Sequence, residues 1–119
     1  MAEQRIELPQ GTLDRLILKV IGLEPQHGWA ISERVQQISS DALQVIQGSL
    51  DPALHRLDRR GWIKARWNTI ENNRQARYYE LNRSGHKQLD AQEDSWRRLT
   101  AAVSRISGYG LNLGPRRTQ

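Results

Sequence analysis

The residues with the most chemistry to offer lie in the segment 47–62, "QGSLDPALHRLDRRGW". Its apolar residues recur at i, i+3, i+4 and i+7, the spacing of one helix face, and they are Leu50, Ala53, Leu54 and Leu57. The remaining faces carry Ser49, Asp51, Pro52, His55, Arg56, Arg59 and Arg60. Arg side chains gathered on one side of a helix suit a polyanion, because a guanidinium pairs bidentately with phosphates and with guanine edges.

Each polar residue of this helix has an expected role in contact with a nucleic acid. The N-terminal part of a recognition helix meets base edges, so His55 and Arg56 are expected to reach bases, with Asp51 and Pro52 at the rim. Ser49 can donate its hydroxyl to a phosphate, and Arg59 and Arg60, one turn later, are expected to contact phosphates. The alternative interpretation is an ordinary solvated surface helix.

Asp51 is the exception, because its negative charge would face the same polyanion. Within the protein, an acid in the first helical turn opposes the positive end of the helix dipole, which contributes about 0.3–1 kcal/mol. Toward a nucleic acid it can accept a hydrogen bond from a cytosine amino group, but it brings no general affinity.

The net charge of +5 belongs to one part of the chain. Residues 47–87 hold nine Lys or Arg and four Asp or Glu, and the rest of the chain is balanced. A charge excess confined to one contiguous segment is typical of a nucleic-acid-binding module. A basic surface that binds nothing is the alternative.

The periodicity predicts three helices followed by two strands. The first helix starts with Thr12 as its N-cap and ends before Pro25, the second covers 28–38, and the third covers 50–60 and stops at Gly61. Residues 43–45, "LQV", predict one short strand. The strands 62–67 and 76–81 alternate in polarity around the Asn-rich tip 68–75. The fold class is therefore mainly α with a small β-wing, a winged helix-turn-helix over residues 8–82.

The tip of the wing offers a second set of contacts. Asn72, Asn73, Arg74 and Arg77 lie at or beside it, and Arg at such a tip is expected in the minor groove. Lys64 and Arg66 share one strand face and are expected along the adjacent backbone. Alternatively, the Asn residues simply provide turn geometry.

Residues 83–106 predict a long last helix, with 107–119 as a flexible tail. Its apolar positions follow the rhythm of a helix that packs on another helix. We therefore expect dimerisation, through Leu89, Trp96, Leu99, Val103 and Ile106, with help from Leu13 and Leu16 of the first helix. Trp96 beside a two-fold axis could form a slot for a planar ligand, or it could simply pack in the dimer core. The other three Trp residues are expected to be core or hinge residues.

Several classes of protein are not favoured. The absence of Cys excludes disulfides and thiolate chemistry and fits the cytoplasm. Residues 1–10 have no apolar core of a signal peptide. His27 and His86 are isolated, so no metal site is expected, and no motif pairs a nucleophile with a base. We expect no cofactor and no enzyme activity.

Five segments in order resemble PadR-like winged-helix transcriptional regulators: "LPQGTLDRLILKVIGL", "HGWAISERVQQIS", "QGSLDPALHRLDRRGWIKARW", "ENNRQARYYELNRSGHKQL" and "SWRRLTAAV". The short members with one C-terminal dimerisation helix are the most similar. The resemblance implies a homodimer that binds a pseudo-palindromic operator on double-stranded DNA, usually as a repressor. Some relatives release DNA on binding a small aromatic molecule, and the "SW" at Trp96 resembles those members. The family commonly has Tyr where this chain has Asp51.

Three hypotheses follow. The chain is an operator-binding dimeric regulator, or a winged-helix module for ligand sensing or protein interaction that has lost operator binding, or a small enzyme. The third has no supporting motif.

Overall fold

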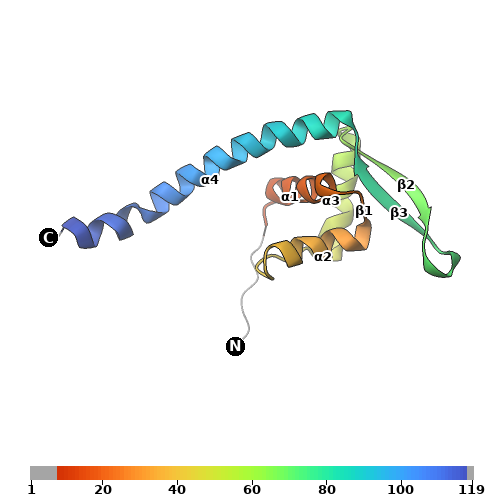
Figure 1. Cartoon of the computed structure of the whole chain (residues 1–119), viewed down its shortest axis with the longest axis horizontal. Coiled ribbons are helices and arrows are strands. Elements are labelled where there is room, and N and C mark those ends of the chain that lie inside the picture. Colours follow the sequence, from red (N-terminus) through yellow and green to blue (C-terminus); the bar gives the residue numbers. More distant parts are fainter. Residues whose placement is uncertain (1–7, 118–119) are drawn as a thin grey trace. The chain divides into compact units, whose positions relative to one another are not determined.

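The computed structural model describes the backbone of residues 8–117 and the side chains of residues 8–109. The elements in chain order are α1 (Gln10–Leu23), β1 (Gln26–His27), α2 (Gly28–Ile38), α3 (Gln47–Arg59), β2 (Ile63–Thr69), the 3-10 turn η1 (Glu71–Asn73), β3 (Gln75–Leu81) and α4 (Arg83–Arg117). These elements are labelled in Figure 1. The chain divides into two units between Leu89 and Asp90, and each is described by itself. The first turns of α4 therefore belong with the winged helix, beyond the predicted boundary at residue 82.

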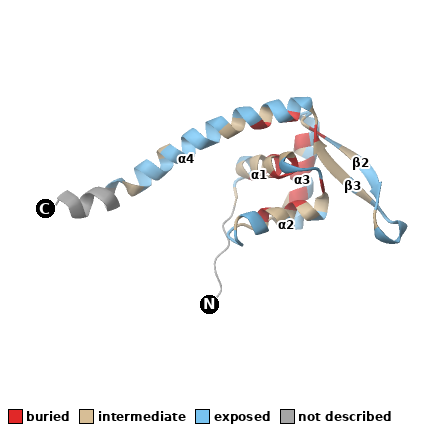
Figure 2. Ribbon diagram, in the orientation of Figure 1, coloured by how far each residue is buried: buried red, intermediate tan, exposed pale blue. Residues whose placement is uncertain are grey.

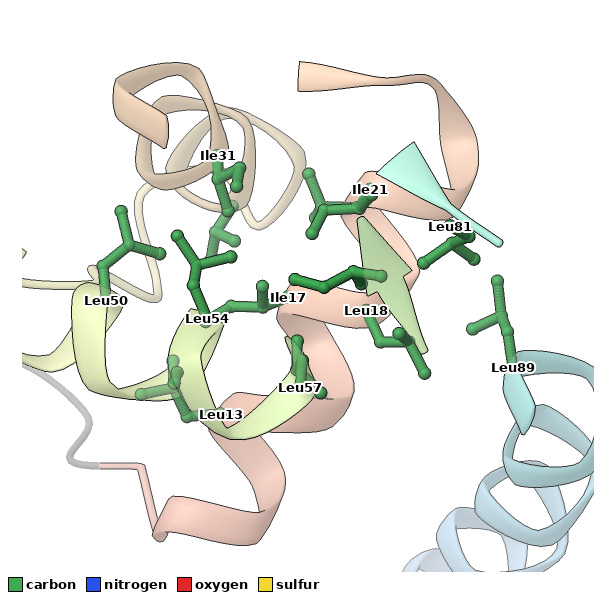
Figure 3. Close-up of a cluster of buried hydrophobic side chains, with 14 residues drawn as sticks. Leu13, Ile17, Leu18, Ile21, Ile31, Leu50, Leu54, Leu57, Leu81 and Leu89 are labelled. Atoms are coloured by element: carbon green, nitrogen blue, oxygen red, sulfur yellow. The ribbon is translucent and has the colours of Figure 1, made fainter. Parts of the chain in front are cut away.

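The core of the first unit forms where α1, α2 and α3 turn their apolar faces toward one another. Ile17, Leu18, Ile31 and Leu50 have no exposed surface, and α3 buries the four residues predicted from its spacing (Figure 3). Leu81 at the end of β3 and Leu89 in α4 complete the same cluster. Figure 2 shows these buried positions on the helices and an exposed hairpin end.

The helix ends differ from the prediction at their N-termini. Pro9, and not Thr12, occupies the N-cap position of α1, and its carbonyl accepts from the amide of Leu13 at 2.9 Å. The helix α3 begins at Gln47, a turn earlier than expected, so Asp51 and Pro52 are its fifth and sixth residues and lie beyond the first turn in which they were expected. Pro52 therefore stands inside the helix, where it lacks the amide that would donate to the carbonyl four residues earlier.

The end of α3 was predicted correctly. Gly61 has φ of +79°, the left-handed region that glycine enters without strain. The amides of Gly61 and Trp62 donate to the carbonyls of Asp58 and Leu57, at 2.9 and 3.2 Å. This pair of bonds closes the helix and turns the chain directly into β2.

The sheet has three antiparallel strands in the order β1-β3-β2. The predicted hairpin is present, and β2 and β3 pair from Ile63 with Leu81 to Thr69 with Gln75. The predicted strand at 43–45 is wrong, because those residues form no strand and the third strand is Gln26–His27, paired with Tyr78 and Tyr79. Leu43 and Val45 instead pack against the core individually.

The helix α4 begins where predicted. Asn82 is its N-cap: the Oδ1 atom accepts from the amide of Gly85 at 2.8 Å, and the Nδ2 atom donates to the carbonyl of Gly61 at 2.8 Å. Gly85 lies against the backbone of Trp62, where a Cβ would collide. The helix continues to Arg117, so the predicted tail at 107–119 is corrected up to that residue. Glycines lower helix propensity by about 1 kcal/mol each but keep their amides, so they weaken a helix without ending it.

Candidate nucleic-acid interface

The buried face of α3 fixes which of its side chains point outward. With Leu50, Ala53, Leu54 and Leu57 inward, a period of 3.6 residues places Pro52, His55 and Arg59 on the opposite side, and all three are exposed. Ser49 and Arg56 lie on one flank and are partly buried, whereas Asp51 and Asp58 lie on the other flank. The side of α3 most accessible to a major groove is therefore the line of Pro52, His55 and Arg59.

Arg56 has a partner inside the protein. Its Nε and Nη2 atoms donate to the two carboxylate oxygens of Asp14 in α1, at 2.9 and 2.7 Å. This bond raises the pKa of the Arg56 guanidinium above its ordinary value. The pair joins α3 to α1 and holds the Arg56 side chain against the first helix. The contact with bases expected of Arg56 stays a prediction, as do those of His55 and Arg59.

Asp51 stands at the exposed edge of the first turns of α3, on the flank toward the hairpin. Gln47 donates to its Oδ1 atom at 3.3 Å. Burial raises the pKa of the Tyr79 hydroxyl in β3, the positive charge of Arg77 opposes this, and the carboxylates of Asp51 and Asp58 raise it further. Asp51 and Asp58 therefore lie within electrostatic range of the hairpin.

The tip of the hairpin is a tight turn. Asn72 and Asn73 have φ of +64° and +58°, a region that Asn tolerates better than other side chains. The amide of Ile70 donates to the carbonyl of Arg74 at 2.8 Å and closes the turn. Both Asn residues thus have a conformational role, and both, with Arg74, are exposed at the end of the wing.

The two faces of the hairpin differ in charge. Lys64 and Arg66 lie on one face, as predicted from their alternation, and both pair with Glu80, at 3.3 Å each. Arg66 also lies over the ring of Tyr78, 5.5 Å from its centroid. One carboxylate shared by two cations offsets part of their charge.

The other hairpin face carries Trp67 and Arg77, which are direct partners in the β2–β3 register. The guanidinium of Arg77 lies over Trp67 and over Tyr79, at 5.3 and 5.9 Å from the ring centroids. The sequence analysis included Arg77 but missed Trp67 and Tyr79. The register could have revealed the pair, because residues 67 and 77 lie equally far from Asn72 at the tip.

The sequence matches the family model described as the transcriptional regulator PadR-like family over residues 17–91. The chain belongs to this family. A PadR-like transcription factor from Bacteroides fragilis is 27% identical, with a TM-score of 0.68 over 82% of this chain and 91% of that one. A PadR-like transcriptional regulator from Bacillus cereus is 24% identical, with a TM-score of 0.70 over 82% and 92% of the two chains. An uncharacterised protein of Lysinibacillus sphaericus is 23% identical, over 77% of this chain and 84% of its own length.

The family settles the class of this PadR-like chain. It is a winged-helix transcription regulator with a DNA-binding fold, and neither the family nor these structural neighbours are enzymes. The recognition helix and wing described above are the parts of that fold that bring polar and basic side chains to the surface. Within residues 8–109, no cluster of His, Cys, Asp or Glu could hold a metal ion. No helix in the described part of the chain is long and apolar enough to cross a membrane.

The tryptophans are placed differently from the sequence-based prediction. Trp62 packs against the core, as expected. Trp29 and Trp67 are 49% and 62% exposed, so neither is a core residue. Trp29 stands at the start of α2 and stacks on His27, with 4.5 Å between the ring centroids. A Trp side chain is large and apolar, so the sequence alone suggests that it is buried. The β2–β3 register instead places Trp67 toward the tip of the hairpin, where it is exposed.

The residues predicted for a dimer interface fall into two groups. Leu13 and Leu89 are 6% and 7% exposed within the core of this PadR-like chain, so they are corrected to core residues. The spacing of Leu89 in the sequence fits the apolar stripe of α4. In the structure, however, Leu13 and Leu89 both pack inside the core of the first unit. Leu16 is partly buried, and the exposed members of the stripe on α4 are Trp96, Leu99, Val103 and Ile106.

Proposed function

We propose that this chain is a homodimeric regulator of the repressor type, acting in the cytoplasm on a pseudo-palindromic operator. The observation that carries the proposal is the outward line of His55 and Arg59 on α3, beside a wing whose tip exposes Arg74. A helix in the major groove and a basic wing tip in the adjacent minor groove would each use the side chains found at those places.

The contacts follow from the exposed positions. His55 and Arg59 read base edges, while Pro52 and Asp51 lie at the rim of the same groove. Ser49 and Arg60 contact phosphates at the two ends of α3, and Asn72, Asn73 and Arg74 contact the minor groove. Lys64 and Arg66 contribute less than Arg77 because they share Glu80.

Dimerisation would place two such units on one operator. Trp96, Leu99, Val103 and Ile106 form an exposed apolar stripe on α4, between 37% and 75% exposed. A second apolar surface lies between α1 and α2, where Leu16, Leu23 and Ile38 line a hollow of about 150 Å³. In the proposed dimer, the stripe of one copy packs on the hollow of the other, so both apolar surfaces leave water. Each Å² of apolar area buried in this way stabilises the dimer by roughly 25 cal/mol.

A small planar aromatic effector is proposed for the dimer centre. Trp96 is the first residue of the exposed stripe, and a two-fold axis near it would bring two indoles together. A ligand between the indoles would change the spacing of the two recognition helices, which is the quantity that a palindromic operator reads.

A second candidate function is a module that has lost operator binding and senses a ligand or binds a protein. The observation in its favour is the acidic flank of α3, where Asp51 and Asp58 face the hairpin. A mobility-shift assay on the DNA upstream of its own gene, with random duplex as competitor, separates the two. A shift that survives the competitor supports the regulator, and the absence of any shift supports the module.

A further inference from the structure

Arg77 is a cation of the wing that lies over an aromatic ring, with its guanidinium 5.3 Å from the centroid of Trp67. The two residues are direct partners across β2 and β3, so the backbone itself holds the ring and the guanidinium together. Tyr79, on the same face of β3, supplies a second ring at 5.9 Å. An Arg held between two rings has fewer rotamers to lose on binding than a solvated Arg, so less entropy opposes its next hydrogen bonds.

The positive charge of Arg77 can attract an anionic ligand. Among residues 8–109, no carboxylate forms an ion pair with Arg77, whereas Arg66 on the opposite face pairs with Glu80 at 3.3 Å. Stacking engages the flat face of the Arg77 guanidinium, and one hydrogen bond joins the guanidinium to the Tyr79 hydroxyl. Its remaining N–H groups are left for a planar or tetrahedral anion. Each hairpin face therefore carries an arginine on an aromatic ring, but a carboxylate offsets the charge of Arg66 and none offsets that of Arg77 in the described part of the chain.

The position of the stack suggests its ligand. Trp67, Arg77 and Tyr79 lie on the same face of the hairpin as Ile63 and Leu81. Ile63 and Leu81 are buried in one cluster with Leu54 and Leu57 of α3, so this hairpin face is turned toward α3. The carboxylates of Asp51 and Asp58 act on Tyr79, which places their flank of α3 on this side. When a recognition helix occupies a major groove, the sugar-phosphate strand that borders the groove passes along that flank.

We propose that Trp67, Arg77 and Tyr79 form a clamp for one phosphate diester of the DNA strand that runs between α3 and the wing. The clamp rests on the proposed function and adds to it the face of the hairpin that meets DNA. Arg77 binds the phosphate, and Trp67 is a positioning residue that acts through Arg77. Asp51 opposes the clamp, because the negative charge of its carboxylate would repel the bound phosphate.

Binding to a labelled duplex of random sequence tests the clamp, because a phosphate contact does not depend on base sequence. Arg77→Lys keeps the charge but loses the stacked fork, and we expect about tenfold weaker binding, equivalent to about 1.4 kcal/mol. Trp67→Leu keeps every charge, and we expect about two- to fivefold weaker binding, the size of an exposed cation–π interaction. Trp67→Phe keeps a ring and should bind nearly as well as the wild type.

The matched control is Arg98→Lys, which makes the same change at an exposed Arg of α4 that is not among the proposed DNA contacts, and it should leave affinity within twofold. Trp67, Arg77 and Arg98 are all exposed, so the variants should fold, and circular dichroism checks this. If the wild type binds duplex and Arg77→Lys and Trp67→Leu bind as well as Arg98→Lys, the clamp is refuted while the proposed function stands. If the wild type binds no duplex, both are refuted.

Discussion

Arg56 of α3 and Asp14 of α1, 42 positions apart in the sequence, form an ion pair with two hydrogen bonds. The Nε and Nη2 atoms of Arg56 lie 2.9 and 2.7 Å from the carboxylate oxygens of Asp14. The side chains are 27% and 15% exposed, so the pair is partly shielded from water. It links the recognition helix to the first helix on the flank opposite to the wing. An arginine for which the sequence predicts a contact with DNA thus also forms an ion pair inside the protein, and its contact with DNA stays a prediction.

The first prediction concerns this pair. Arg56→Ala should lower the free energy of unfolding by about 1.5 kcal/mol, the lower range for hydrogen bonds to charged groups, because the pair is only partly buried. Urea denaturation measures this. The double variant with Asp14→Ala should lose little more than either single variant, since both remove the same interaction. Additive losses would show that the two residues act separately.

The second prediction separates base reading from phosphate binding. Arg59→Ala should relax the sequence preference of binding, because Arg59 lies on the outward line of α3. Arg74→Ala should weaken binding to all duplexes alike and reduce the slope of log K against log salt by about 0.9. Titrations of specific and random duplex at several salt concentrations measure both. If Arg74→Ala instead lost the preference for the specific duplex over the random one, Arg74 would be a base-reading residue and the assignment would be wrong.

The third prediction concerns Asp51. Asp51→Tyr should raise operator affinity about tenfold or more, equivalent to 1.4 kcal/mol, because it removes a negative charge from the flank that faces the phosphate strand. The melting temperature should fall slightly or not at all, since α3 begins at Gln47 and Asp51 lies beyond the first turn, where the helix dipole stabilises an acid only weakly. Weaker operator binding by Asp51→Tyr would instead identify the carboxylate as a base-reading contact.

The fourth prediction concerns dimerisation. Leu99→Glu combined with Val103→Glu should give monomers by light scattering, because both side chains belong to the exposed apolar stripe of α4. Ala101→Glu is the matched control: it adds the same charge on the exposed opposite side of the helix and should remain dimeric. A stable dimer of the double variant would exclude the stripe as the interface.

The fifth prediction concerns the effector. Titration with planar aromatic compounds should quench tryptophan fluorescence, and Trp96→Ala should abolish the quenching. Trp29 and Trp67 are also exposed, so Trp29→Phe and Trp67→Phe are needed as controls and should retain it. Equal quenching in Trp96→Ala, lost in one of the controls, would move the site to the wing or to α2.

Local periodicity was sufficient for the three helices and the hairpin of the winged helix, but not for β1, which pairs with a distant segment. The four apolar positions of α3, Gly61 as its stop and the hairpin around Asn72 depend on neighbours within a few residues, so they can be read from the sequence. The basic segment could be located in the same way, because charge is a property of composition. The family followed from the order of such segments.

Only the tertiary structure decided which side chains meet inside the protein. Arg56 and Arg59 are both arginines of one helix, but only Arg56 of the two meets Asp14, which lies 42 positions away, and Arg59 is exposed. Leu89 and Leu99 both fit one helical stripe, but only Leu89 meets the core that α1 and β3 form. Trp67 meets Arg77 only because the strands pair in this register. Such relationships depend on contacts between distant segments, and a periodic pattern along one helix or strand carries no information about which distant segment will lie against it.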